Sequence, residues 1–515
     1  MSINLAWKDV KWKLVYRRLS RQQRRVYKAS LEGNTAKVQA LQRRIISSLD
    51  ARLIAVKCVT TDNNTRQRNI ASMKGQKAIL NDKKIKLASN LKLDGKASAI
   101  RRVCIQKNRK SKIRLLDISI IEDRAKQMLA KLALEPEWEA IFESNSYGCR
   151  PGRSYYDAIA SLVISLRDKP RFVLDTDIHN CFGRINHEKL LKKLGTFGQM
   201  ESQISAWLKT DIILDYRNKP DEIFQSMEGK SQEGIIYPLL VNIALHGLET
   251  YIKERFPLTG LSHEIPMKKR KASIGFSRYV DHFVITALKE SDIMQIKKHV
   301  NIWLNEEIGF TLSKAKIRIM NSTEGFEFLG FHLILRKILG QYKLKIHPSK
   351  SSKQRLISKT RDIIQKNRSA SSYNLINLLT PRIIGWSNYF KFVECQIDLS
   401  KMDYLIFKQV RAWVFRRKSK GLSSRTKIKD KYFPNGRTYV FRGRKYTNNW
   451  ILVGGILING KKNENFLPKL LWFQFSKHDT IRGNASPYDS NYTYWTARMK
   501  KYSGYNRSIS KLIKR

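Results

Sequence analysis

Apolar residues recur three or four positions apart in the first fifty residues of the chain, which is the spacing of one helix face. Two series follow this spacing, one formed by Leu14, Val15 and Leu19 and the other by Val38, Leu41, Ile45 and Ile46. Gly33-Asn34 stands between them, and such a pair is typical of a break between elements. The pattern predicts two helices between Trp7 and about Leu53.

Another helix is predicted where the same spacing returns, at Ala125, Met128, Leu129, Leu132 and Ala133. This helix would run from Ile121 to about Phe142. Glu122-Asp123 would lie in its first turn, where negative charge is favoured by the positive end of the helix dipole.

The period changes to two in residues 172–178, a β-rich segment whose side chains alternate between two faces. Asp175 and Asp177 share one face with Val173. A second strand pair is expected around residues 277–286.

Between these strands, Pro238 begins an apolar helix over residues 239–245, as proline does at a first helical position. After about Lys350 the apolar pattern again favours helices. Strands that alternate with helices indicate an α+β or α/β body.

The chain is strongly basic. It has 515 residues, 99 Lys and Arg against 43 Asp and Glu, and a formal net charge of +56. Self-repulsion at this charge destabilises a compact state unless a polyanion neutralises it. Nucleic acid is the expected partner, because each Lys or Arg on a phosphate releases a counterion. An anionic membrane surface is the alternative. The length and the hydrophobic share of 42% fit about two to four domains with real cores.

A membrane-spanning segment is not expected. The most apolar run, residues 234–248, contains Tyr237, Asn242 and His246. It is shorter than the ~20 apolar residues that a spanning helix needs. The first residues also lack the apolar core of a signal peptide.

The positive charge is concentrated at both ends of the chain. Residues 1–120 carry 30 Lys and Arg against 7 Asp and Glu, and residues 401–515 carry 27 against 5. The C-terminal part also contains Trp413, Phe415, Tyr432, Phe433, Trp450, Trp472, Tyr494 and Trp495. Basic residues interleaved with aromatic ones suit phosphates and unstacked bases, although most tryptophans pack in cores. The N-terminal helices could equally cap the main domain or lie on RNA, and the two roles are compatible.

Two aspartates, Asp177 and Asp281, stand at the ends of β-rich segments. Carboxylates from separate strands hold Mg²⁺ ions in enzymes that transfer phosphoryl groups. The spacing leaves Asp175 as an alternative to Asp177. It also leaves open that these are ordinary surface residues.

Several blocks resemble those of one protein family. Arg278-Tyr279-Val280-Asp281-His282-Phe283-Val284 resembles the Arg-Tyr-Ala-Asp-Asp-Phe-Val core of reverse transcriptases. Ser146-Tyr147-Gly148-Cys149-Arg150-Pro151-Gly152-Arg153-Ser154 resembles Ser-Tyr-Gly-Phe-Arg-Pro-Gly-Arg-Ser of group II intron-encoded proteins. Further blocks follow in the family's order at residues 101–103, 122–124, 174–178, 238–243, 325–331, 385–390 and 486–489. The chain is thus identified as a member of the group II intron-encoded reverse transcriptase/maturase family, of the cyanobacterial and plastid kind.

The resemblance implies an α+β fold of the right-hand polymerase type. A basic helical N-terminal extension would occupy residues 1–60, and fingers and palm residues 61–335. A helical thumb with the maturase segment called domain X would follow at 345–440, and a small basic DNA- or RNA-binding-like region at 441–515. The last residues resemble the stretch before the family's His-Asn-His nuclease, so cleavage of a target strand is not expected.

The resemblance also implies roles for single residues. The family's metal-binding positions correspond to Asp177 and Asp281. Positions that contact nucleotide and template correspond to Phe182, Gln232, Lys316 and Arg114. Mg²⁺ would be bound by the intron ribozyme, and at the palm only if polymerase activity persists.

The departures from the family pattern lie mainly on the palm. His282 stands where the family has a second aspartate, so an oxygen donor and a negative charge are lost from a Mg²⁺ site. Glu233 replaces a glycine near the incoming nucleotide, Gly183 replaces an acid, and Tyr237 replaces a serine. These changes indicate that polymerase activity is lost or weak, and they leave open whether the protein is an enzyme.

The resemblance therefore favours a maturase, an RNA-binding cofactor that stabilises folded intron RNA while the RNA splices itself. The expected phosphate contacts are Arg17, Arg18, Arg24, Arg25, Arg411, Arg416, Arg417 and Lys418. Trp386, Tyr389 and Tyr432 are expected to be structural parts of domain X. One alternative is an active RNA-directed DNA polymerase that supports intron mobility, aided by Mn²⁺, which accepts nitrogen ligands more readily. The other is an untargeted basic RNA binder.

The expected partner is group II intron RNA, with DNA and a second copy of the chain as further candidates. Richness in Lys, Asn and Ile indicates an AT-rich genome. Together with the plastid-like motifs and an N-terminus unlike a transit peptide, this indicates synthesis in a plastid (chloroplast). A cyanobacterial cytoplasm is the alternative.

Overall fold

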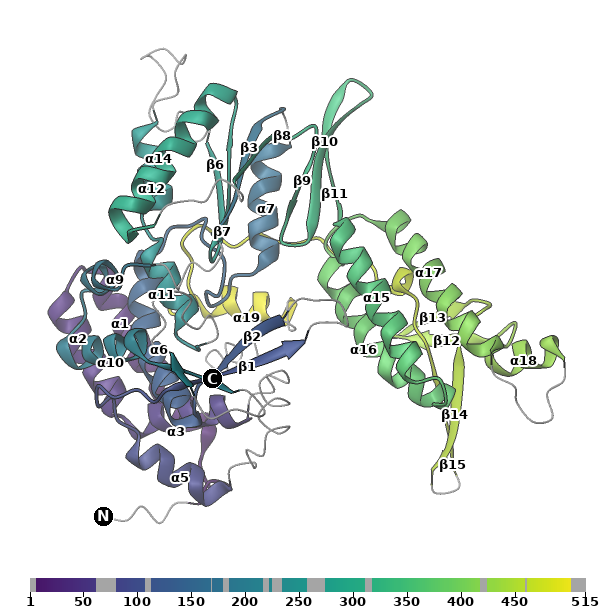
Figure 1. The fold of residues 1–515 in the computed structure, drawn as a ribbon, viewed down its shortest axis with the longest axis horizontal. Coiled ribbons are helices and arrows are strands. Elements are labelled where there is room, and N and C mark those ends of the chain that lie inside the picture. The colour runs from purple at the N-terminus through teal and green to yellow at the C-terminus, as the bar shows by residue number, and fades with distance from the viewer. Residues whose placement is uncertain are drawn as a thin grey trace. The chain divides into compact units, whose positions relative to one another are not determined.

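The computed structural model describes residues 6–61, 80–106, 113–167, 169–178, 185–215, 222–224, 234–256, 274–310, 317–416, 424–458 and 461–501. The chain divides into two compact units (Figure 1). The first unit comprises Met1–Ser165, Phe172–Ile319 and Thr480–Arg515, and the second comprises Leu166–Arg171 and Met320–Asp479.

Helices make up much of the first unit. They are α1 (Trp12–Leu31), α2 (Thr35–Ser47), α3 (Leu49–Thr61), α5 (Asn81–Asn90), α6 (Ile121–Ile141), α7 (Tyr155–Leu166), α9 (His187–Leu194), α10 (Gly198–Lys209), α11 (Tyr237–Ala244), α12 (Leu248–Arg255), α14 (Glu290–Ile308) and α19 (Tyr492–Lys501).

Helices α1, α2 and α3 pack around α6 (Figure 1). The two predicted N-terminal helices are confirmed as α1 and α2. Asn34 ends the break between them, because its side-chain oxygen accepts a hydrogen bond from Lys37 N at 2.9 Å and caps α2. Helix α6 is also confirmed, with Glu122 and Asp123 in its first turn. Helix α3 was not predicted from the apolar spacing.

The sheet that carries the candidate site has the strand order β6-β7-β3-β8. Its strands are β3 (Phe172–Asp177), β6 (Gly275–Tyr279), β7 (His282–Ala287) and β8 (Ile317–Asn321). Strand β7 pairs antiparallel with both β3 and β6, so the two predicted strand regions are confirmed. Helix α14 packs against β3 and β7. Pro238 lies in the first turn of α11, as expected.

A second sheet in the first unit has the order β2-β1-β4-β5. Its strands are β1 (Ile100–Gln106), β2 (Ile113–Ile118), β4 (Ile212–Asp215) and β5 (Glu222–Phe224). Strand β1 pairs antiparallel with β2 and parallel with β4, and β4 pairs antiparallel with β5.

The C-terminal segment, residues 480–501, belongs to the first unit. Tyr488 donates its hydroxyl to Glu135 at 2.9 Å, and Arg153 donates to the carbonyl of Gly483 at 3.1 Å. Trp495 is buried. The segment therefore clusters with residues more than three hundred positions away, whereas the domain boundaries expected from the sequence group it with residues 441–479.

The second unit combines helices with small sheets. Its elements are β9 (Phe326–Phe328), β10 (Phe331–Ile338), β11 (Gln341–Pro348), α15 (Lys350–Lys366), α16 (Ser372–Phe390), α17 (Gln396–Phe415), α18 (Arg425–Tyr432), β12 (Thr438–Phe441), β13 (Arg444–Thr447), β14 (Val453–Ile458), β15 (Lys461–Phe466) and the 3-10 helix η2 (Leu470–Trp472). The prediction of helices after Lys350 is confirmed as far as Tyr432, but two hairpins follow. Tyr439, Ile451 and Trp472 form a small core in this part.

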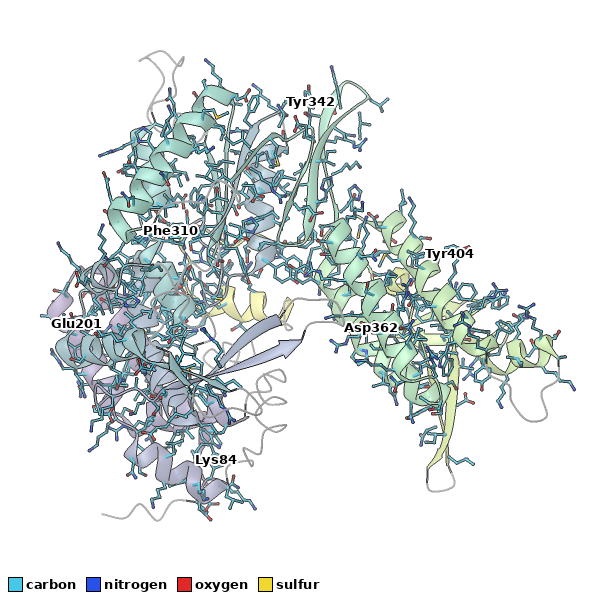
Figure 2. All side chains as sticks on the ribbon, viewed as in Figure 1. Lys84, Glu201, Phe310, Tyr342, Asp362 and Tyr404 are labelled. Carbon is cyan, nitrogen blue, oxygen red and sulfur yellow. The ribbon has the colours of Figure 1, made fainter. Side chains whose placement is uncertain are left out.

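The surface of the second unit carries exposed aromatic residues. Tyr342 lies on β11 and Tyr404 on α17 (Figure 2). Among the described residues of both units, every helix is too short or too polar to cross a membrane.

Candidate functional site

The β6–β7 hairpin turns at Val280 and Asp281. Val280 has a φ of 60°, a left-handed conformation that is an outlier for a β-branched residue. Ile178 N donates a hydrogen bond to the carbonyl oxygen of Asp281 at 3.1 Å, which joins the turn to the end of β3. Strain of this kind persists only where the surrounding structure fixes it, and it gathers at functional sites.

The register of β3 and β7 places Asp177 directly opposite His282. Opposite residues of an antiparallel pair point to the same face, and Asp175 shares that face because it lies two positions before Asp177. His282 Nε2 lies 2.6 Å from Asp175 Oδ1, and these side chains are 22% and 14% exposed. His282 is therefore engaged with the carboxylate that the sequence did not assign to a metal.

Hydrogen bonds from Asn242 and Arg278 hold the hairpin turn in place. Asn242 donates to the carbonyl of Gly148 at 2.8 Å, and Arg278 donates to Asn242 at 3.2 Å and to the carbonyl of Val280 at 3.3 Å. A side chain at Gly148 would overlap the backbone of Tyr279 and Val280. The block around Gly148 thus acts on the candidate site by holding its hairpin. The resemblance to the family singled out this block in the sequence. It did not predict that the block contacts the β6–β7 hairpin.

One departure from the family pattern has a packing role. Tyr237 is buried and covers Gly234, where a Cβ atom would lie 2.6 Å from the Tyr237 ring. Glu233 and Gly183 lie outside the described residues.

One face of α1 is lined by exposed cations. They are Lys13, Arg17, Arg21, Arg25 and Lys28, which follow one another at spacings of four, four, four and three. We call this set the basic face of α1. It contains two of the expected phosphate contacts. Arg21 was missed, although its i, i+4 spacing from Arg17 was a usable signal.

The other two cations expected on α1 have protein partners. Arg18 lies 3.7 Å from Asp50 and its side chain is 63% exposed. Arg24 is half-buried, with its guanidinium 4.4 Å from the centre of the Tyr492 ring. Arg24 is therefore a less accessible phosphate ligand than its neighbours on the basic face.

The remaining predicted residues belong to the second unit or have no described side chain. Arg411 and Arg416 are exposed near the end of α17. Phe182, Gln232, Lys316, Arg417 and Lys418 lie outside the residues that the structure describes. Arg114 lies in β2, but its side chain is not described. Within the second unit, Tyr389 donates its hydroxyl to the carbonyl of Leu329 at 2.7 Å, and Trp386 packs on Phe390 with ring centroids 4.5 Å apart.

Three family models match successive parts of the chain. The N-terminal domain of reverse transcriptase matches residues 7–91, and the reverse transcriptase (RNA-dependent DNA polymerase) matches residues 105–333. The group II intron, maturase-specific domain matches residues 353–433. The chain belongs to the group II intron reverse transcriptase/maturase family. It consists of a reverse transcriptase domain followed by a maturase domain, with mixed helix and sheet.

The known proteins to which this chain is similar are distant from it in sequence. Protein YkfC of Escherichia coli (strain K12) is 28% identical over 260 residues, which cover 46% of this chain and 67% of that protein. Group II intron-encoded protein LtrA of Lactococcus lactis subsp. cremoris is 24% identical over 288 residues, which cover 46% of this chain and 47% of LtrA. Maturase-like protein 1 of Euglena gracilis is 24% identical over 403 residues, which cover 77% of this chain and 79% of that protein. The chain thus spans about half the length of LtrA.

In a reverse transcriptase/maturase the expected metal ligands are Asp177 and Asp281. Asp177 is exposed at the end of β3, and Asp281 is half-buried in the turn. Within the described ranges, no three His, Cys, Asp or Glu side chains gather as a metal-binding group. The side chains at the hairpin do not make a complete Mg²⁺ site, because His282 takes the place of an oxygen donor and is paired with Asp175.

Proposed function

We propose that the protein is a group II intron maturase that binds intron RNA and assists its folding and splicing. The observation that carries this proposal is the 2.6 Å contact between His282 and Asp175 beside the hairpin turn. In this contact His282 engages the carboxylate of Asp175, which lies next to the family's metal positions. The match to the maturase-specific domain, over residues 353–433, also supports the proposal. The chain would then serve the RNA as a binding partner, and the ribozyme with its own Mg²⁺ would perform the chemistry.

We further propose the finer layout that the family implies. Fingers and palm would occupy residues 61–335, after the basic extension at 1–60. The thumb and domain X would occupy 345–440, and the basic region 441–515 would contact RNA, with DNA as a second candidate. Limited proteolysis of the chain, alone and with intron RNA, tests these boundaries, since protection by RNA should extend over 1–60 and 345–515.

The basic face of α1 is a suitable surface for RNA. Its cations are exposed and succeed one another along a helix of 20 residues. Each cation that binds a phosphate releases a counterion. The logarithm of the affinity for RNA should therefore fall linearly with the logarithm of the salt concentration.

A splicing assay tests the proposal with a matched pair of variants. A self-splicing group II intron transcript is incubated at a Mg²⁺ concentration too low for the RNA alone, with and without the full chain. We expect the chain to restore splicing. Arg17→Gln/Arg21→Gln/Arg25→Gln should lower affinity on the order of 10- to 100-fold and reduce the salt slope by about 2–3, because three phosphate contacts are removed.

The control removes the same charge elsewhere on the first unit. Lys192, Lys209 and Lys298 are exposed on α9, α10 and α14. The triple Gln variant at these positions should splice and bind like the natural chain. Equal losses in both triple variants would indicate non-specific attraction, and no effect of the natural chain on splicing would refute the maturase function.

An active polymerase is the second candidate, because the β6–β7 hairpin that carries Asp281 is formed and Asp177 lies opposite position 282. We expect the natural chain to give background primer extension on an RNA template with Mg²⁺. His282→Asp should raise extension on the order of 100-fold, since a correctly held metal ion contributes several kcal/mol of charge stabilisation.

The primer-extension assay carries its own check. Adding Asp177→Asn to His282→Asp should abolish the gain and thereby exclude a contaminating polymerase. Clear DNA synthesis by the natural chain, with Mg²⁺ or with Mn²⁺, would overturn the view that polymerase activity is lost.

We propose a plastid as the compartment, with a cyanobacterial cytoplasm as the alternative. The richness in Lys, Asn and Ile supports an AT-rich genome. A coding sequence found in nuclear DNA would contradict both. Homodimer formation remains a proposal that sedimentation of the purified chain would test.

A further inference from the structure

A cavity of about 40 Å³ lies within the second unit, between α16, α17, Phe433 and the segment that follows β13. Most of its lining is apolar and buried. Four lining residues are only partly covered, namely Asp403, Phe407, Trp450 and Lys469. The maturase-specific match ends at residue 433, so the Trp450 side of the cavity lies beyond it.

Three aromatic rings meet at this cavity. Phe407 and Phe433 lie 5.6 Å from Trp450, centroid to centroid, and 6.1 Å from each other. Phe407 is edge-on to both other rings. Phe433 is buried, whereas 37% of Trp450 remains exposed. Part of the indole is therefore accessible to a further planar group.

The backbone holds Trp450 in an unusual conformation. Its φ is 64°, which bulky residues rarely adopt. The preceding asparagines are pinned, because Asn449 accepts from Gly436 N at 3.2 Å and Asn448 accepts from the Trp472 indole at 2.9 Å. These two hydrogen bonds fix the side chains of the residues that lead into Trp450.

The polar groups of the cavity are of two kinds. Asp403 accepts from Leu470 N at 2.8 Å on one oxygen and from Leu471 N at 3.0 Å on the other. Each oxygen retains a lone pair for a further donor. Burial raises the pKa of Asp403 to about 6, although the two amide donors and Lys469 oppose this shift. Lys469 lines the cavity, and Lys429 Nζ lies 5.2 Å from the centre of the Trp450 ring.

We propose that this cavity binds one unstacked nucleobase of single-stranded RNA. The base would stack on Trp450, its N–H edge would meet Asp403, and Lys429 and Lys469 would lie near the adjoining phosphate. The proposal rests on the proposed function, because it takes the partner to be RNA, and it deepens that function by naming a base-binding position.

The chemistry of the cavity favours a nucleobase over an apolar peptide side chain. An aliphatic side chain would cover the carboxylate of Asp403 without giving it a donor, which is unfavourable for a buried charge. A base supplies both a planar face and N–H donors, and its phosphate matches the two lysines. The space holds only a few waters, so the edge of the base would enter while its face remains on the exposed indole.

Binding of a short, unstructured, fluorescein-labelled RNA to the full chain tests the proposal. It is compared, at one salt concentration, with an abasic RNA that has the same phosphates. Trp450→Leu should weaken binding of the base-containing RNA roughly 5- to 100-fold and leave binding of the abasic RNA unchanged. Trp450→Phe should recover most of the loss, which separates lost stacking from lost folding.

The matched control is Tyr404→Leu. Tyr404 is exposed on α17 (Figure 2) and has Lys408 Nζ 4.5 Å from its ring centre. It is not among the residues that line the cavity. This variant should bind both RNAs as the natural chain does. A second readout is the site at which RNA containing 4-thiouridine crosslinks to the chain, which should map to peptides holding Trp450 or Phe407.

Equal losses for the two RNAs, or crosslinks confined to other peptides, would overturn the base-binding cavity. The maturase function would still stand if the natural chain promotes splicing. Conversely, a chain that fails to promote splicing but shows the Trp450-dependent preference for bases would keep the cavity and refute the maturase function.

Discussion

Replacing Arg150 by alanine is expected to lower the free energy of unfolding of the first unit by about 3–5 kcal/mol. Arg150 and Glu139 are each 1% exposed. The guanidinium donates to both oxygens of Glu139, at 2.8 and 3.1 Å, and to the carbonyls of Glu143 and Ser146, at 2.7 and 2.8 Å. Alanine would leave a buried carboxylate without this counter-charge and two buried carbonyls without this donor.

Urea denaturation read by hydrogen exchange in peptides of α6 measures this loss in the first unit alone. The control is Arg255→Ala, since Arg255 is an exposed arginine of the same unit that also lies over an aromatic ring, 4.8 Å from the centre of Tyr251. Its effect should stay within about 0.5 kcal/mol. A loss below about 1 kcal/mol at Arg150 would mean that Glu139 regains water or takes up a proton in the variant, so that no uncompensated charge stays buried.

Much of the fold followed from local patterns. The alternation in residues 172–178 predicted β3, and the spacing of Ala125, Leu129 and Leu132 predicted α6. Such patterns succeed because each of these elements has a buried side and a more exposed side. Helix α3 was missed for the opposite reason. Its residues 53–56 are all buried, so no polar face interrupts the apolar run and no period can be detected.

The partner of His282 could not be predicted from the sequence. The family comparison identified His282 as a replacement for an acid, and period two placed Asp175 on one face of its strand. Their contact depends on the register between β3 and β7, which places Asp177 opposite His282 and so brings Asp175 within reach. Register is a property of two distant segments together, and neither segment contains it alone.

The arginines in residues 146–154 have a structural role that the basic composition of the chain does not reveal. Two arginines in a chain of net charge +56 suggest contacts with phosphate. Arg150 and Arg153 are instead buried and donate to protein carbonyls and to Glu139. Burial and the ion pair with Glu139, which lies on α6, distinguish Arg150 from an RNA contact, and a buried acid has no signature in sequence.

Asp157→Ala is expected to cost about 3–5 kcal/mol of the stability of the first unit and to release its C-terminal segment. One oxygen of Asp157 accepts from the amide and hydroxyl of Ser154, both at 2.9 Å, at the start of α7. The other accepts from Ile481 N at 3.1 Å and from Arg498 at 2.7 Å. One buried carboxylate therefore joins the beginning of α7 to residues 480–501. Its loss should increase proteolysis after Thr480, because local opening follows the loss of buried contacts.

A double-mutant cycle with Arg498→Met separates the ion pair from the helix cap. Arg498→Met keeps the amide and hydroxyl donors of Asp157, so it should cost less than Asp157→Ala. The double variant should cost less than the sum of the two, by about 0.5–3 kcal/mol, since it leaves neither charge buried beside an apolar neighbour. Additive costs would show that the two side chains act independently. The charge would then matter only to α7, and the C-terminal segment would be held by contacts such as those of Tyr488 and Trp495.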